Sequence, residues 1–211
     1  ISAHDFVSIL FDSLGMRGLV VGPDTALGRN REGDLDFLKK CGDEMGFWLE
    51  SAEPFSLDGS PVKSRLIRSS ISSGDVEGTA KMLGRKYSVT SEVITGDKRG
   101  REMGFPTANL KMDYRTLLPN DGIYATWAVI DGVHYPSATS IGIRPTFNLT
   151  ERLVEVHLID FDQDIYGKQL SVEFVSKLRD QEKFSGLDEL IEKINQDVAD
   201  CRSILEDDRG N

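Results

Sequence analysis

The sequence predicts an α/β segment followed by a small antiparallel β-barrel that ends in a helix. Helical stripes alternate with short apolar strands over the first part of the chain. Five runs rich in β-branched and aromatic residues follow in quick succession, and one amphipathic helix closes the sequence. We place the boundary near residue 85, which gives domains of residues 1–84 and 85–211.

The first domain shows the alternation of helix and strand that is typical of a parallel sheet. Ser2 and Asp5 stand in capping-box spacing at the start of its first helix. The expected helices cover residues 2–14, 35–45, 64–71 and 76–83, and the expected strands cover residues 18–22 and 47–49. About two strands are too few for a complete sheet of this type, so the segment is predicted to be half of a domain.

The second domain is rich in strands. They are expected at residues 87–95, 123–130, 134–140, 153–161 and 170–178. Asp131-Gly132, between two of these runs, predicts a hairpin. Short strands at this spacing predict a small antiparallel barrel.

The chain ends in an expected helix. Ser185 and Asp188 form a second capping box, and an apolar stripe runs from Leu187 to Cys201. This stripe is expected to pack on the barrel.

The composition excludes several classes of protein. A formal net charge of −10 argues against extensive contact with nucleic acid, although a phosphate site needs only a few local donors. The two cysteines, Cys41 and Cys201, lie outside any CxxC, which predicts reduced thiols in a cytoplasmic protein. No apolar run is long enough for a membrane span, and the first residue, Ile1, predicts a fragment or a processed chain.

A glycine-rich stretch is the most informative part of the sequence. Gly96, Gly100 and Gly104 recur at every fourth position, with basic residues such as Lys98 between them. Glycines let backbone N–H groups approach an anion, and the basic residues supply charge. The stretch is neither a Walker A loop nor GxGxxG, and a hairpin loop with a solvated basic tip is an equal alternative.

The segment Pro106-Thr107-Ala108-Asn109 follows directly. In an extended chain, Thr107 and Asn109 share one face and offer two neutral oxygens. Such ligands, together with phosphate oxygens, suit Mg²⁺. The alternative is that both side chains make turn hydrogen bonds.

A third element is the strand pattern around Glu155. Alternation places Glu155 and His157 on the face opposite the valines at positions 154 and 156. Glu155 can act as a general base if that face lines a cleft, and is an ordinary exposed carboxylate if the face meets water.

Together these elements resemble the riboflavin kinase family over roughly residues 86–205. The ordered motifs that carry the resemblance are Gly100-Arg101, Gly104-Phe105-Pro106-Thr107-Ala108-Asn109, Gly122-Ile123-Tyr124, Ile141-Gly142-Ile143-Arg144-Pro145-Thr146-Phe147, Val154-Glu155-Val156-His157, Asp164-Ile165-Tyr166-Gly167 and Leu178-Arg179 with Lys183-Phe184.

The resemblance implies a six-stranded Greek-key barrel and the transfer of the γ-phosphate of ATP to riboflavin, which yields FMN and ADP. It implies that Glu155 is the catalytic base and that Thr107 and Asn109 hold Mg²⁺. The residues it implies for cofactor and substrate binding are Gly96, Lys98, Gly100, Gly104, Pro106, Thr107, Asn109, His157, Arg179 and Phe184. Arg179 and Phe184 belong to the flavin side, and His157 either touches nucleotide or is structural.

The first domain is similar to the second half of the FMN adenylyltransferase domain found before this kinase in bifunctional FAD synthetases, a partial Rossmann-like nucleotidyltransferase. The family's HxGH motif is absent from the sequence, and Lys63 and Arg65 replace a serine and a threonine of its Ser-Ser-Thr-x-Ile-Arg motif. We expect no FAD synthesis by this chain alone.

The predicted partners are therefore the small molecules ATP and riboflavin, with no nucleic acid and no membrane. An alternative function is a flavin- or nucleotide-binding module without catalysis, which would retain FMN tightly and show no turnover.

Overall fold

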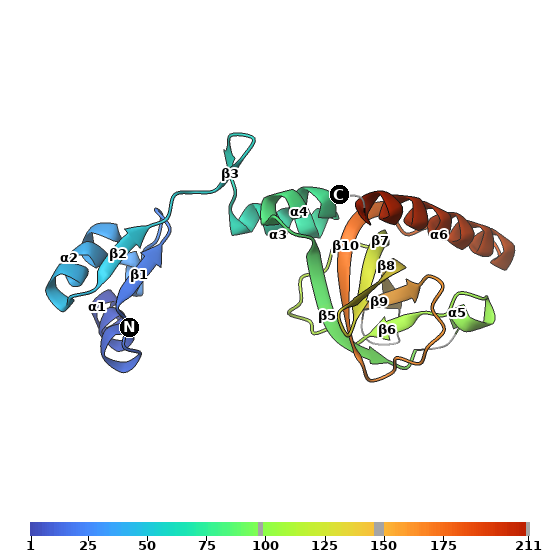
Figure 1. The fold of residues 1–211 in the computed structure, drawn as a ribbon, viewed down its shortest axis with the longest axis horizontal. Helices are drawn as coiled ribbons and strands as arrows, with labels where there is room; N and C mark the ends of the chain where they lie inside the picture. The colour runs from blue at the N-terminus through green and yellow to red at the C-terminus, as the bar shows by residue number, and fades with distance from the viewer. Residues whose placement is uncertain (97–98, 146–149, 210–211) are drawn as a thin grey trace. The chain divides into compact units, whose positions relative to one another are not determined.

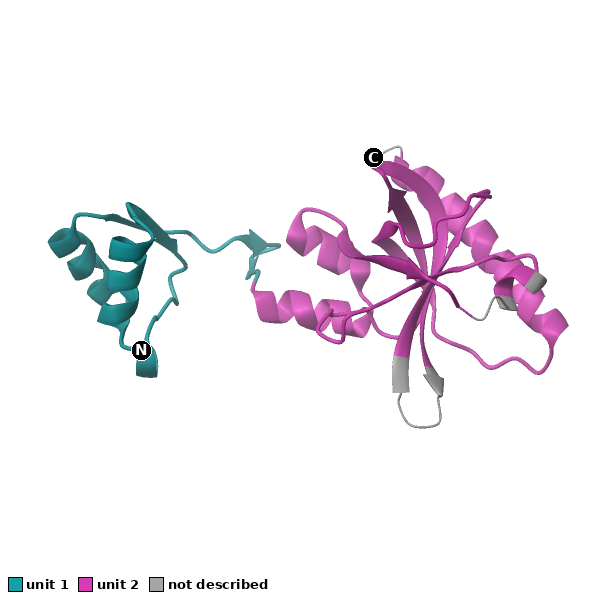
Figure 2. Ribbon diagram, turned by 90° about the horizontal axis from the view of Figure 1, so that it is seen from below, with its two compact units in different colours: residues 1–62 teal, residues 63–211 magenta. Residues whose placement is uncertain are grey.

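The computed structural model describes residues 1–96, 99–145 and 150–209, so predicted site residue Lys98 and motif residues Thr146 and Phe147 lie outside the described residues. The chain divides into two compact units, residues 1–62 and 63–211 (Figure 2). The predicted boundary at residue 85 stays a prediction. Between the division at residues 62 and 63 and the predicted boundary at residue 85 lie helices α3 (Ser64–Ser73) and α4 (Val76–Leu83). Helix α4 packs against strands of the second unit.

The first unit is built around two parallel strands. It contains α1 (Ala3–Ser8), a π-helical turn (Ile9–Ser13), β1 (Gly18–Val21), a 3₁₀ turn (Arg29–Arg31), α2 (Leu35–Met45), β2 (Trp48–Ser51), β3 (Ser56–Leu57) and β4 (Ser60–Pro61). β1 pairs in parallel with β2, and α2 packs on β2 (Figure 1). Val7, Leu38 and Phe47 form the buried core between the helices and the strands. The α/β segment predicted from the sequence is confirmed.

Two details of this unit differ from the sequence prediction. The first helix changes to a π-helical turn at Ile9, although the stripe predicted one continuous helix to residue 14. The β3–β4 hairpin was also not predicted from the sequence. Its turn residues Asp58 and Gly59 have φ values of 50° and 77°, the left-handed conformation that Asp-Gly favours in hairpins.

The second unit is a closed barrel of six strands. They are β5 (Tyr87–Ile94), β6 (Ala108–Leu110), β7 (Gly122–Ile130), β8 (Val133–Pro145), β9 (Thr150–Leu158) and β10 (Gln169–Arg179). Their order around the barrel is β10-β5-β6-β9-β8-β7, and every neighbouring pair is antiparallel. The predicted barrel is confirmed. Strand β6, which is not among the five strands expected from the sequence, has only three residues. Helix α5 (Arg99–Glu102) lies in the connection before it.

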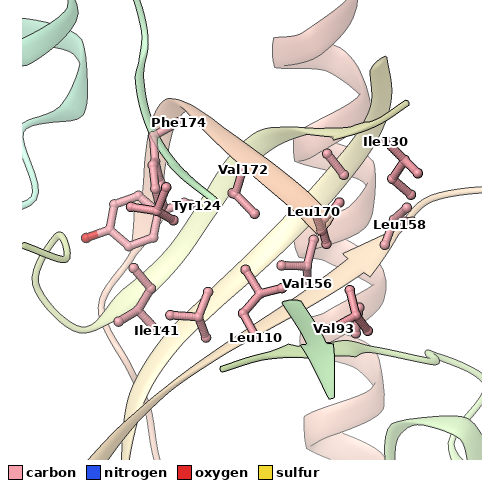
Figure 3. Close-up of a cluster of buried hydrophobic side chains, with 14 of the residues drawn as sticks. Val93, Leu110, Tyr124, Ile130, Ile141, Val156, Leu158, Leu170, Val172 and Phe174 are labelled. Atoms are coloured by element: carbon pink, nitrogen blue, oxygen red, sulfur yellow. The ribbon is translucent and has the colours of Figure 1, made fainter. Parts of the chain in front are cut away.

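The barrel interior is filled by apolar side chains from all six strands. Tyr124, Phe174 and Val156 are fully buried there and are drawn in Figure 3. The Tyr124 and Phe174 rings meet edge to face, with centroids 5.4 Å apart. The predicted hairpin between β7 and β8 is confirmed, because Asp131 and Gly132 both have positive φ between paired Ile130 and Val133. These inward side chains fill the barrel as a packed core, and the alternate side chains of the strands point to its outer face.

Helix α6 (Leu187–Arg209) covers part of that outer face. Cys201 and Leu205 pack on Ala125 and Trp127 of β7, as the apolar stripe predicts. The predicted capping partner of Ser185 was wrong: the carboxylate of Glu189, not Asp188, accepts hydrogen bonds from the Ser185 N–H and hydroxyl.

Both cysteines are free and buried, in line with the predicted reduced thiols. Burial, with Asp197 and Asp200 nearby, raises the pKa of the Cys201 thiol to about 12. No helix within the described residues combines the length and the apolar character needed to cross a membrane.

Candidate active site

A row of five side-chain positions crosses the outer face of the barrel. Asn109 of β6 pairs with Glu155 of β9, and Glu155 pairs in turn with Ser140 of β8. Ser140 pairs with Ile123 of β7, and Ile123 with Arg179 of β10. Residues paired directly across strands point to the same side. Since the alternate residues, such as Val154 and Val156, fill the interior, this row faces outward.

The larger of the two cavities that Thr107 lines, with a volume of about 660 Å³, lies along this row. Glu155, Ser140, Ile123 and Arg179 contribute to its barrel side. The cavity is also lined by Leu190, Ile194 and Val198 of α6, and by Phe105 and Phe184. Its volume and its mix of apolar walls with a few polar groups are typical of small-molecule sites.

The smaller cavity has a volume of 410 Å³. Arg101, Pro106 and Thr107 line it together with the loop of residues 161–166. Thr107 contributes to both cavities. This residue therefore lies where ligands in the two cavities would approach each other.

The glycine-rich stretch forms a tight loop next to Thr107. A Cβ on Gly100 would collide with the Phe105 carbonyl, and the Gly100 carbonyl accepts a hydrogen bond of 2.8 Å from the Phe105 N–H. Gly104 has φ +86°, a conformation that favours glycine. These two glycines shape the loop, which is a local reason for their spacing besides any contact with phosphate.

Asn109 is held against the start of the same loop. A Cβ on Gly96 would overlap the Asn109 side chain, so glycine at position 96 makes room for the amide. Asn109 of β6 faces outward, and in an extended chain Thr107, two residues earlier and just outside the strand, shares that face. Neither Gly96 nor Asn109 lines either cavity, whereas Thr107 lines both.

These two residues fit a bound Mg²⁺. Both offer neutral oxygens: Asn109 lies opposite Glu155 across the strand pair, and Thr107 lines both cavities. Magnesium binds through few protein ligands and takes the rest from water and phosphate. The described residues contain no group of three His, Cys, Asp or Glu side chains that could hold a metal by themselves.

His157 lies on the same outer face as Glu155. Its Nδ1 is 2.8 Å from the Pro106 carbonyl oxygen, and its ring meets the Phe105 ring edge to face at 5.7 Å. His157 lines the larger cavity and not the smaller one. Its predicted contact with nucleotide stays a prediction.

Arg179 and Phe184 both line the larger cavity, and their predicted place on the flavin side stays a prediction. The guanidinium of Arg179 lies 5.7 Å from the Phe184 ring centroid. It also donates hydrogen bonds of 2.9 and 2.7 Å to the two carboxylate oxygens of Asp197 on α6. These hydrogen bonds and the charge of Asp197 raise the pKa of Arg179, although partial burial acts in the opposite direction. Arg179 therefore fastens α6 to the barrel along the cavity.

Asp197 and Gln181 were not predicted from the sequence as residues of the site. Gln181 donates hydrogen bonds to the Ser140 hydroxyl and the Ile141 carbonyl, at 3.0 and 2.9 Å. Asp197 is only 5% exposed. A lone acidic residue between Ile194 and Val198, inside the apolar stripe of α6, was the signal that could have revealed it.

Replacing Asp197 with alanine is expected to destabilise the barrel unit by about 3 kcal/mol, because it leaves a largely buried guanidinium without its main partner. Thermal unfolding should show a fall in Tm of about 6–12 °C. Arg202→Ala on α6 is the control, since it breaks a bidentate pair with Asp160 in which the Arg202 and Asp160 side chains are 44% and 71% exposed. It should cost less than about 1 kcal/mol. Equal losses in the two variants would contradict a stabilising role for the buried pair.

The comparisons with known proteins agree on one family. A family model described as riboflavin kinase matches residues 83–205, and one described as FAD synthetase matches residues 1–66. The bifunctional riboflavin kinase/FMN adenylyltransferase of Pseudomonas fluorescens is 39% identical over 206 residues, 97% of this chain and 66% of that protein. The protein of the same description in Escherichia coli K12 is 34% identical over 207 residues, again 97% and 66%.

A solved structure is similar as well. The crystal structure described as a macrolide-efflux protein from Streptococcus pneumoniae has a TM-score of 0.85 at 30% identity, and the match covers 96% of this chain and 65% of that chain. The chain thus spans just under two thirds of the length of these relatives.

Proposed function

The chain belongs to the riboflavin kinase family, and from this we propose that its barrel transfers the γ-phosphate of ATP to the 5′-hydroxyl of riboflavin, giving FMN and ADP. One observation carries the proposal: Thr107 lines both cavities, and Glu155 lines the larger of them. A phosphoryl transfer needs a donor and an acceptor in separate sites that meet at the reacting atoms.

The larger cavity is the proposed riboflavin site. Its apolar side chains from α6, with Phe105 and Phe184, suit an isoalloxazine ring, and its polar groups suit the ribityl hydroxyls. The smaller cavity is the proposed ATP site. Arg101 offers a cation to phosphate there, and the loop of residues 161–166 offers polar groups to the rest of the nucleotide.

Glu155 is the proposed general base. Its carboxylate accepts the proton of the ribityl 5′-hydroxyl while that oxygen forms a bond to the γ-phosphorus. The bond between the γ-phosphorus and the bridging oxygen breaks, and ADP leaves with the electron pair. The position of Glu155 in the cavity that also includes Thr107 supports this role.

Thr107 and Asn109 are the proposed ligands of Mg²⁺. When bound, the ion neutralises negative charge on the nucleotide phosphates. The side chains then fix where the phosphates lie relative to Glu155, because Asn109 is directly opposite Glu155 in the β6–β9 pair. A base and a metal site on adjacent strands of one closed barrel stay aligned without movement of a domain.

Chromatographic separation of riboflavin, FMN and FAD after incubation with ATP and Mg²⁺ tests the proposed function. We expect FMN as the product. FAD is not expected from these 211 residues, because they contain no HxGH motif. Tight retention of FMN without turnover would instead identify a binding module. Formation of FAD would contradict the expectation that these residues do not synthesise FAD.

A further inference from the structure

The pairing of β6 with β9 stops one residue short of the proposed metal ligand Thr107. The last paired residues are Ala108 and Val156. Pro106, two positions earlier, has no N–H and cannot donate a ladder hydrogen bond. Its carbonyl is instead 2.8 Å from Nδ1 of His157, the residue that follows Val156. A side chain thus donates to the Pro106 carbonyl just beyond the end of the ladder.

The direction of this hydrogen bond follows from its acceptor. A carbonyl oxygen can only accept, so Nδ1 of His157 carries the hydrogen. The Phe105 ring packs on the imidazole edge to face, which makes a second contact between the same two segments. His157 is therefore attached to both residues that immediately precede Thr107.

We propose that His157 is a positioning residue for phosphoryl transfer: its Nδ1–H holds Pro106 and thereby places the Thr107 hydroxyl between the two cavities. The inference rests on the proposed kinase function and extends it. Residues 105–107 separate the cavities, since Phe105 lines the larger, Pro106 the smaller and Thr107 both. A misplacement of about 1 Å in such a segment can cost about 10²-fold in rate.

Two substitutions separate the hydrogen bond from the ring packing. His157→Phe keeps an aromatic ring against Phe105 and removes the donor. His157→Asn places an amide N–H at the position of Nδ1 and removes the ring. We expect His157→Phe to lower kcat by about 10- to 100-fold and to raise the Mg²⁺ concentration for half-maximal rate, with riboflavin affinity within about twofold of wild type. His157→Asn should stay within about fivefold of wild-type kcat.

The matched controls are His134→Phe and His134→Asn. His134 is the second residue of β8 and lines neither cavity. Both should leave kcat unchanged. An active Phe variant with an impaired Asn variant would overturn the inference, because it would assign the role to packing. Equal loss in both variants, or no loss in either, would overturn it as well.

The affinity for Mg²⁺ with ADP, measured by calorimetry, distinguishes failure of this inference from failure of the proposed function. If wild-type protein forms no FMN, the kinase proposal fails. The position of Thr107 is still tested in that case, since weaker binding in His157→Phe but not in His157→Asn supports it and equal binding in the two refutes it. Thermal unfolding of each variant confirms that folded protein is compared.

Discussion

Glu155→Gln is expected to lower kcat by about 10²–10⁴-fold, because the amide keeps the shape of the side chain and cannot accept the proton of the attacking hydroxyl. Riboflavin affinity, measured by quenching of flavin fluorescence, should change by less than about twofold. A loss confined to kcat would mean that Glu155 acts in the transition state and not in substrate binding.

Glu92→Gln is the matched control for this substitution. Glu92 is an exposed carboxylate on β5, in the same barrel and outside both cavity linings. It should retain wild-type turnover. Turnover of Glu155→Gln close to that of the control would remove Glu155 as the base and leave the positioning of substrates as the main source of catalysis.

Asn109→Ala is expected to raise the Mg²⁺ concentration needed for half-maximal rate by about tenfold or more, since a metal held by few protein ligands loses one of them. Titration of FMN formation with Mg²⁺ at saturating ATP measures the effect. Asn195→Ala removes an exposed amide from α6 and should leave the titration unchanged. A curve for Asn109→Ala that matches this control would exclude Asn109 from the metal site.

The neutral side chain at position 109 has a physical reason. Asn109 and Glu155 are directly opposite each other in an antiparallel pair, with Cβ atoms about 5 Å apart. A second carboxylate at that distance would place two like charges side by side, which is unfavourable. An amide supplies an oxygen for the metal without adding a negative charge beside the base.

Much of the fold could be predicted because its signals are local. Runs of β-branched residues marked five of the six barrel strands, and Asp131-Gly132 marked the hairpin between β7 and β8. β6 was not predicted as a strand, because a run of three residues is too short to show alternation. The π-helical turn at Ile9 keeps the same apolar spacing as a helix, so the stripe alone did not distinguish them.

The candidate site was only partly readable from the sequence. The outward direction of Glu155 follows from alternation, but its pairing with Asn109 joins residues far apart in the chain and depends on barrel closure. The ion pair of Arg179 with Asp197 and the bond of His157 to Pro106 are likewise non-local. No periodic pattern within one segment contains such contacts.

The row of residues across the barrel has a consequence for how such a protein can change in length. Insertion or deletion of one residue within β9 would turn Glu155 and His157 into the apolar interior and Val154 and Val156 outward. Catalysis and folding would be lost together, because a carboxylate would be buried without a partner. We therefore expect related sequences to differ in length in connections such as residues 159–168, while the spacing along β9 stays fixed. The alternation along β9 therefore fixes which side chains reach the site, and these side chains can change by substitution but not by insertion or deletion.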